Sequence, residues 1–177
     1  MPNYRRSRVP GGTYFFTVNL LNRTSRLLVD EIAALRAAIR KVRTARPFHT
    51  DCWVVLPDHM HCIWTLPPGD VDYPSRWNAI KISFAKSIPR TESLSAVRLA
   101  KEEKGLWQRR YWEHTIRDEL DYSRHVDYVH FNPVKHGQVA RVCDWPYSSF
   151  PNFVVAETCA HDWASDADQS LIAGERN

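Results

Sequence analysis

Two kinds of periodicity alternate along the chain, and their order limits the fold more than any other feature of the sequence. Four segments are rich in aromatic and β-branched side chains, which is typical of strands: 13–20, 48–56, 59–66 and 106–115. Three segments repeat apolar residues every three or four positions, which predicts amphipathic helices: 28–46, 77–88 and 118–131. The predicted order is therefore β-α-β-β-α-β-α.

This order is that of the ferredoxin-like, or split βαβ, arrangement, with one helix added at its C-terminal end. The sequence thus predicts an α+β domain built on an antiparallel sheet. Pro57-Asp58 is compatible with a tight hairpin between the second and third strands, and Pro133 is expected to end the third helix. The polar segment 90–104 is predicted to be a loop or a frayed helix. Because many unrelated activities use this fold, function has to be sought in individual side chains.

Length and composition indicate one globular domain. The chain has 177 residues, of which 44% are hydrophobic and 25% charged, and a chain of this size can bury a core without a disulfide or metal staple. Its four cysteines form no CxxC pair, which argues against a zinc ribbon. No apolar run approaches the ~20 residues that cross a bilayer, and the polar start lacks the apolar middle of a signal peptide. We therefore expect a cytoplasmic protein with no membrane partner.

Charge is distributed unevenly along the chain. Residues 1–154 carry 23 Lys and Arg against 15 Asp and Glu, whereas residues 155–177 carry one Arg against five Asp and Glu. The basic part attracts polyanions, nucleic acid first, although a well-solvated surface explains the charge equally well. The predicted organisation is a basic N-terminal arm over 1–12, a folded domain over 13–153 and an acidic C-terminal tail over 154–177.

A pair of histidines flanks Met60 on the third predicted strand. Alternate side chains of a strand point to the same face, so the imidazoles of His59 and His61 are expected to be neighbours, with Met60 on the opposite face. Two half-buried histidines beside a turn are the simpler interpretation of this pattern. A catalytic metal site is the other, and it needs a third ligand from elsewhere in the chain.

The third predicted helix offers such a ligand together with a phenol. At about 100° per residue, a polar stripe separates from the apolar one and comprises Asp121, Arg124, His125, Tyr128 and Asn132. Asn132 lies one turn beyond Tyr128, so one helix can supply a phenol and a metal donor. A phenol, with its ordinary pKa of about 10, is a poor nucleophile unless a base or a positive centre favours its phenolate. A surface tyrosine on a solvated face is the alternative.

His59-Met60-His61 resembles the His-hydrophobic-His motif of the single-tyrosine HUH transposases. Within that class, the chain is similar to the REP-associated tyrosine transposases, an IS200-like family, along six segments in the same order. These segments are PNYRR (2–6), PGGTYFFTVNL (10–20), WVVLPDHMHCIWTLP (53–67), LWQRRYWEHTIRDE (106–119), YVHFNPVKHGQV (128–139) and DWPYSSF (144–150).

The resemblance implies a role for each residue of the site. Tyr128 matches the nucleophile of the family, and His59, His61 and Asn132 match its ligands for Mg²⁺ or Mn²⁺. The residues over 13–153 then form an HUH nuclease domain. The implied reaction is cleavage and rejoining of single-stranded DNA that folds as palindromic hairpins, through a 5′-phosphotyrosine and a free 3′-hydroxyl.

Arginines are the predicted DNA contacts. Those of the N-terminal arm are expected to contact phosphates or reach a groove, and those that precede the fourth strand stand beside an aromatic pair, Tyr111 and Trp112. Trp112 itself is expected in the core, and His114 and His136 in structural positions. The predicted DNA-binding residues are Arg5, Arg6, Arg8, Arg109 and Arg110.

Three other functions fit parts of the pattern. A replication or plasmid-transfer nuclease uses the same histidine pair and tyrosine, but 177 residues leave no room for the helicase of such proteins. A non-catalytic hairpin-DNA-binding protein derived from a transposase would keep the arginines and need no nucleophile. A zinc hydrolase would use water in place of the tyrosine. A monomer and a homodimer are both compatible with the sequence.

Overall fold

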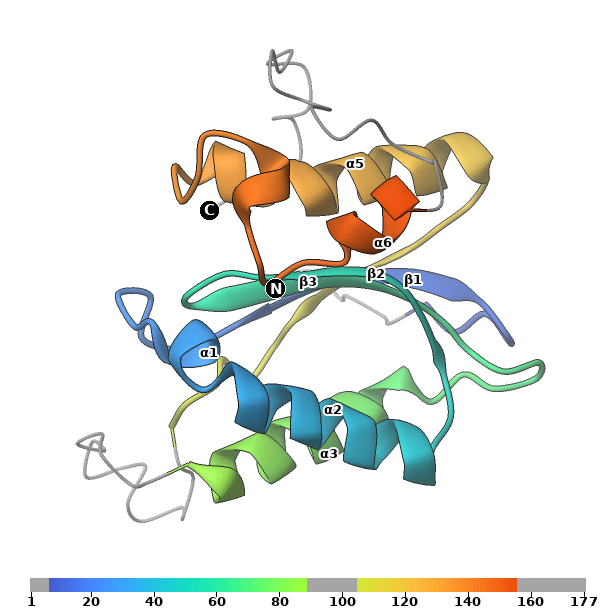
Figure 1. Cartoon of the computed structure of the whole chain (residues 1–177). Coiled ribbons are helices and arrows are strands. Elements are labelled where there is room, and N and C mark those ends of the chain that lie inside the picture. Colours follow the sequence, from blue (N-terminus) through green and yellow to red (C-terminus); the bar gives the residue numbers. More distant parts are fainter. Residues whose placement is uncertain (1–6, 89–104, 156–177) are drawn as a thin grey trace, which may run out of the picture.

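A computed structural model describes residues 7–88 and 105–155 of the chain (Figure 1). Arg5, Arg6, the predicted loop over 90–104 and most of the predicted acidic tail lie outside the described residues. Among the described residues, no helix combines the length and the apolar character that crossing a membrane requires. The elements are β1 (Thr13–Asn19), α1 (Leu27–Asp30), α2 (Ile32–Ala45), β2 (His49–Val55), β3 (His59–Thr65), α3 (Tyr73–Ser87), β4 (Trp112–Thr115), α5 (Glu119–Lys135), η1 (Val142–Asp144) and α6 (Phe150–Val155).

The four strands form one antiparallel sheet in the order β2-β3-β1-β4. The central strands β1 and β3 pair along their full length, from Thr13 opposite Thr65 to Asn19 opposite His59. Helices α2 and α3 cover one face of the sheet, and α5 lies across the other (Figure 1). This arrangement confirms the predicted ferredoxin-like fold with an added C-terminal helix.

Alternation along β1 and β3 decides which side chains meet which helices. Trp64 faces α3, where its ring stacks on that of Trp77 with centroids 4.2 Å apart, and both rings are buried. Phe15 points to the other face and packs beneath α5, with its ring 5.8 Å from that of Tyr128. Buried aromatic pairs of this kind contribute about 1 kcal/mol beyond the area they remove from water. Both faces are therefore held by aromatic contacts.

Helix α5 runs past Pro133, so the prediction that this proline ends the helix was wrong. Pro133 lies in the last turn, where its missing N–H removes a single intrahelical hydrogen bond. The helix continues to Lys135, and the backbone N–H of His136 still donates to the carbonyl of Asn132 at 3.0 Å. Gly137, whose φ is +63°, then turns the chain away in a conformation that favours glycine.

The bounds of several other elements also differ from the predicted ones. The helix predicted over 28–46 is divided at Glu31 into α1 and α2. The strand predicted over 106–115 pairs regularly only over Trp112–Thr115, and Trp107 forms an isolated bridge to Leu20. The short helices η1 and α6 were not predicted, because three to six residues are too few to show a helical period.

The outer edge of β2 is covered by the segment before α6. The backbone N–H of Val55 donates to the carbonyl of Tyr147 at 2.8 Å, and that of Ser149 donates to the carbonyl of Trp53 at 2.9 Å. The indole N–H of Trp145 also donates to Val55 at 2.9 Å. A covered edge cannot pair with a further strand, so this contact fixes α6 beside the sheet.

Candidate active site

The two histidines of β3 lie side by side, as strand alternation predicts. Both side chains are buried, and their ring centroids are 5.0 Å apart with the planes at 85°. Met60, between them, faces the opposite side of the sheet, where it lines a groove with Val55. Two imidazoles from one strand thus reach the face that α5 crosses.

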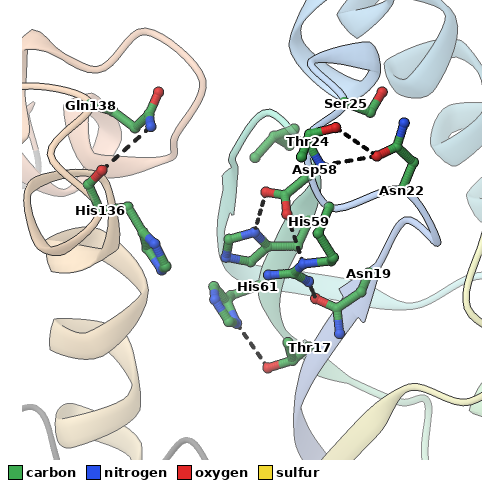
Figure 2. Close-up of polar contacts among 12 residues, drawn as sticks. Thr17, Asn19, Asn22, Thr24, Ser25, Asp58, His59, His61, His136 and Gln138 are labelled. Carbon is green, nitrogen blue, oxygen red and sulfur yellow. Dashed lines mark hydrogen bonds and ion pairs between the residues drawn. The ribbon is translucent and has the colours of Figure 1, made fainter. Parts of the chain in front are cut away.

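A hydrogen bond to Nδ1 orients each ring (Figure 2). Nδ1 of His59 lies 2.8 Å from Oδ1 of Asp58, and Nδ1 of His61 lies 2.8 Å from Oγ1 of Thr17. The other carboxylate oxygen of Asp58 forms an ion pair with Arg23 at 2.8 Å. When Nδ1 is held in this way, Nε2 is the nitrogen through which the ring binds a metal, and the carboxylate makes the imidazole a better ligand. Neither Asp58 nor Thr17 was among the predicted site residues.

Two groups of the site, His61 and Asp58, have pKa values below their ordinary ones. Burial, and then the charges of His59 and His136, hold the pKa of His61 well below its usual range, so this ring is neutral. Burial alone would raise the pKa of Asp58, but the hydrogen bond and charge of His59, with Arg23, outweigh it and lower that pKa. A neutral imidazole is the form of His61 that binds a metal ion, and an ionised Asp58 carboxylate is the form that accepts a hydrogen bond from Nδ1 of His59.

Helix α5 places a row of residues against the histidine pair. The ring of Tyr128 lies 5.2 Å from that of His61, and the ring of His136 lies 5.0 Å from that of His59. Tyr128, Asn132 and His136 follow one another at steps of four, which puts them on one side of the helix. Because the outer two members contact the two histidines, Asn132 between them faces the pair.

The side chain of Asn132 is fully buried. Neither its Oδ1 nor its Nδ2 has a hydrogen-bond partner among the described residues. An unpaired buried carboxamide is costly, typically about 1 to 3 kcal/mol for each polar atom. An oxygen in this state fits a ligand of a hard divalent ion. Two imidazoles and this carboxamide oxygen would leave coordination positions for a substrate.

His136 was predicted to be structural, and the structure places its ring beside that of His59, with the residue exposed. Figure 2 shows the His136 ring on the α5 side, facing the histidine pair. The available signal was its spacing, two steps of four beyond Tyr128. That spacing places His136 on the same side of the helix as Tyr128 only if α5 continues past Pro133.

A second group of possible metal ligands lies at the start of α5. One ligand atom from each of His114, Asp121 and His125 lies within 4.8 Å of the others. Hydrogen bonds already engage the carboxylate of Asp121, which accepts from Nε2 of His114 at 2.9 Å and from the backbone N–H and Nε of Arg117 at 3.1 Å each. Nδ1 of His125 contacts the backbone carbonyl of Asp121 at 2.7 Å. These contacts join β4 to α5, and we call His114, Arg117, Asp121 and His125 the clamp.

The clamp is expected to contribute to the free energy of unfolding by an amount that depends on pH. Burial alone would raise the pKa of Asp121, but hydrogen bonds from Arg117 and His114 outweigh it and hold that pKa well below its usual range. A carboxylate with a lowered folded-state pKa stabilises the fold above its unfolded pKa of about 3.9, and this stabilisation is lost as the pH falls toward the folded value. Asp121→Asn should therefore lower the free energy of unfolding by about 2 kcal/mol near neutral pH.

Urea denaturation of both proteins over a range of pH checks this prediction. The difference between native protein and variant should shrink below pH about 4, where the carboxylate of the unfolded chain becomes protonated. Equal stability near neutral pH would show that the clamp contributes nothing.

The predicted DNA-binding arginines that the structure describes are exposed: Arg8, Arg109 and Arg110. Gln108, next to Arg109, donates its backbone N–H to Asn19, and Asn19 pairs with His59. Arg109 and Arg110 therefore follow a residue that is hydrogen-bonded at the same end of the sheet as His59.

The prediction of a core position for Trp112 was wrong, because this side chain is 50% exposed and stacks on His114 with centroids 5.9 Å apart.

Comparison with known proteins identifies the class. No family model matches the chain. It is 49% identical over 176 residues to the REP-associated tyrosine transposase of Escherichia coli K12, a match that covers 99% of this chain and 98% of that protein. A Haemophilus influenzae protein of the same family name is 43% identical over 172 residues, with 97% and 98% covered. A solved structure of the REP-associated tyrosine transposase bound to a REP hairpin matches with a TM-score of 0.82 at 50% identity, over 100% of this chain and 99% of that one.

All three relatives are transposases, which are enzymes of DNA strand transfer, and the likeness extends over the whole chain. The chain belongs to the family of REP-associated tyrosine transposases. The resemblance that the six sequence segments indicated is thereby confirmed. The family indicates the class of reaction, which is DNA strand transfer. The mechanism has to be inferred from the geometry around His59 and His61.

Proposed function

We propose that the chain cleaves and rejoins single-stranded, hairpin-forming DNA through a 5′-phosphotyrosine at Tyr128, with Mg²⁺ or Mn²⁺ held by His59, His61 and Asn132. The observation that carries this proposal is the row of α5 residues laid against the histidine pair, with Tyr128 at His61 and the unpartnered carboxamide of Asn132 in its middle. The hairpin substrate is proposed from the solved relative, which is bound to a REP hairpin. We assign the activity to residues 13–153.

The histidine pair is prepared to hold the ion. Asp58 and Thr17 fix the rings of His59 and His61 through Nδ1, so that little rearrangement is needed when a metal binds. A bound divalent ion withdraws charge from the non-bridging oxygens of a phosphodiester and favours the phenolate of a nearby tyrosine. Lys135 brings a second positive charge, because its Nζ lies 4.9 Å from the centroid of the Tyr128 ring.

The proposed step is an in-line displacement at phosphorus. Tyr128 loses its phenolic proton, its oxygen attacks the phosphorus, the bond from phosphorus to the 3′ oxygen breaks, and that oxygen takes up a proton. The products are a 5′-phosphotyrosine and a free 3′-hydroxyl. Because the new ester conserves the energy of the broken bond, a 3′-hydroxyl of another strand can attack it and restore both the DNA and Tyr128 without ATP.

DNA has to be held while these bonds exchange. The exposed Arg109 and Arg110 extend from the segment beside Asn19, and Arg8 belongs to the basic arm. Contacts from such arginines to phosphates position the strand without reading its sequence. Arg5 and Arg6 remain predicted contacts of the same kind.

The test is direct. Labelled single-stranded hairpin DNA is incubated with the protein and Mn²⁺ or Mg²⁺, with and without EDTA, and the products are separated under denaturing conditions. We expect a covalent protein–DNA adduct that EDTA prevents. Tight hairpin binding with neither cleavage nor adduct under any metal would instead support a non-catalytic DNA-binding protein derived from a transposase.

The proposed metal site predicts a measurable role for Asp58, which does not itself bind the ion. Asp58→Asn should weaken Mn²⁺ binding by about 10- to 100-fold, because His59 loses the carboxylate that orients it and strengthens it as a ligand. Isothermal titration with Mn²⁺ measures the change. Asp30→Asn removes an exposed carboxylate of α1 and is the control, with unaltered Mn²⁺ binding expected. If Asp58→Asn binds Mn²⁺ like the native protein, the carboxylate of Asp58 does not support the proposed metal site.

A further inference from the structure

We propose that a groove away from the histidine pair binds a second stretch of the single-stranded DNA, as a track for the strand that flanks the hairpin. This inference rests on the proposed function, and it adds a contact surface that the cleavage site does not need for its chemistry. The groove lies where α2, the edge strand β2 and α6 meet, and it has a volume of about 340 Å³. Met60 and Cys62 in its floor alternate along β3 with His59 and His61, so the floor belongs to the opposite face of the sheet.

One wall of the groove is a stripe of arginines. Arg36, Arg40 and Arg43 line it from α2, at positions i, i+4 and i+7, and all three are exposed. The stripe spans about 10 Å along the helix axis, given a rise of 1.5 Å per residue. Among the residues that the structure describes, none of the three forms an ion pair. An extended row of unneutralised guanidinium groups suits a linear polyanion better than a single small anion.

The floor of the groove suits bases. It is apolar and contains Trp53, which is half-buried, and the guanidinium carbon of Arg36 lies 5.4 Å from the centroid of the Trp53 ring. Half-buried Phe153 of α6 lines the other side. A cationic wall beside an aromatic floor is the arrangement that binds a single strand, with phosphates on the cations and bases stacked on the rings. In a duplex the bases are paired and stacked within the helix, so they cannot use this floor.

Two further features of the groove argue against a peptide ligand and for a nucleic acid. The edge of β2 at Trp53 and Val55 already pairs with the segment before α6, so a peptide cannot bind there by adding a strand. Asp51 is the acidic residue in the lining, and its carboxylate accepts a hydrogen bond from Thr65 at 3.0 Å. Positive charge therefore dominates, and it is complementary to a nucleic-acid backbone.

The test uses charge-matched double variants. Arg40→Gln with Arg43→Gln removes two charges from the groove. Lys41→Gln with Lys86→Gln removes two charges from the neighbouring hollow between α2 and α3, and is the control. Affinity for a hairpin alone and for the same hairpin with a long single-stranded flank is measured by fluorescence anisotropy over a range of salt concentrations. Circular dichroism verifies that both variants are folded.

We expect the groove variant to bind the flanked hairpin about tenfold more weakly. The slope of the logarithm of the binding constant against the logarithm of the salt concentration should become shallower by about 0.7 for each lost phosphate contact. Its affinity for the hairpin alone should equal that of the native protein, and so should the extent of cleavage at saturating DNA. Equal losses of affinity in both variants, or a loss of affinity for the hairpin without a flank, would overturn the proposal.

If the groove instead holds acidic residues of the chain's own C-terminal segment, the arginine substitutions should strengthen DNA binding, which would also overturn the proposal. Because binding is measured separately from cleavage, failure of the groove and failure of the proposed chemistry are distinguishable.

Discussion

Tyr128→Phe is expected to abolish the covalent protein–DNA adduct and to lower strand cleavage by about 10⁴-fold or more, which is typical for removal of a nucleophile. The variant loses one oxygen and keeps the ring that packs against His61 and Phe15. The fold and the affinity for hairpin DNA should therefore be unaltered. Denaturing electrophoresis of labelled DNA measures the adduct, and fluorescence anisotropy measures binding.

Tyr122 supplies the control on the same helix. Burial, with smaller contributions from Asp51 and other nearby groups, raises the pKa of Tyr122 to about 12, so this phenol is a poorer source of phenolate than an ordinary tyrosine. Tyr122→Phe should form the adduct at the native rate. A Tyr128→Phe variant that still forms the adduct would mean that another residue is the nucleophile.

His61→Gln is expected to have the second largest effect, a loss of cleavage of about 10³-fold together with the loss of tight Mn²⁺ binding. Glutamine is polar and close in volume, so the buried position is not left as a cavity. The effect should fall on the chemical step and leave hairpin affinity nearly native, because the proposed contacts to the hairpin are arginines and not the metal ligands. Mn²⁺ titration and single-turnover cleavage measure the two quantities.

His130 provides the matched control, because it is buried like His61 and lies outside the pair. Burial lowers the pKa of His130 to about 4, and Nε2 of this ring lies 3.0 Å from Oγ of Ser149. His130→Gln should lower stability while Mn²⁺ binding and metal-dependent cleavage of the folded protein stay native. If the two variants lose cleavage equally and both keep Mn²⁺, the loss at His61 reflects folding and the proposed metal site is wrong.

The parts of the site that depend on local geometry were predictable. The alternation of a strand places His59 and His61 together, and the four-residue step of a helix separates Tyr128 from Asn132, whatever the rest of the chain does. The order of the elements likewise indicated the ferredoxin-like fold. That α5 faces the histidine pair follows only from the resemblance to the family or from the structure.

The missed features all depend on contacts between distant segments. Thr17 reaches His61 because β1 pairs with β3 in a register that no local pattern reveals. His136 reaches the site because α5 continues past Pro133. Trp112 resembled a core residue in its sequence context, but the short edge strand β4 leaves its side chain half-exposed. The arginine stripe of α2 lines a groove only because the fold brings Trp53 of β2 beside Arg36.

The most direct test of the central claim is to identify the residue that carries DNA after the reaction. The protein is incubated with a hairpin oligonucleotide and Mn²⁺, digested with protease and nuclease, and analysed by tandem mass spectrometry. We predict a nucleotide linked through its 5′-phosphate to the peptide that contains Tyr128, with the modification located on that residue. Attachment at any other residue, or cleaved DNA with free 5′-phosphates and no modified peptide, would contradict the proposed mechanism.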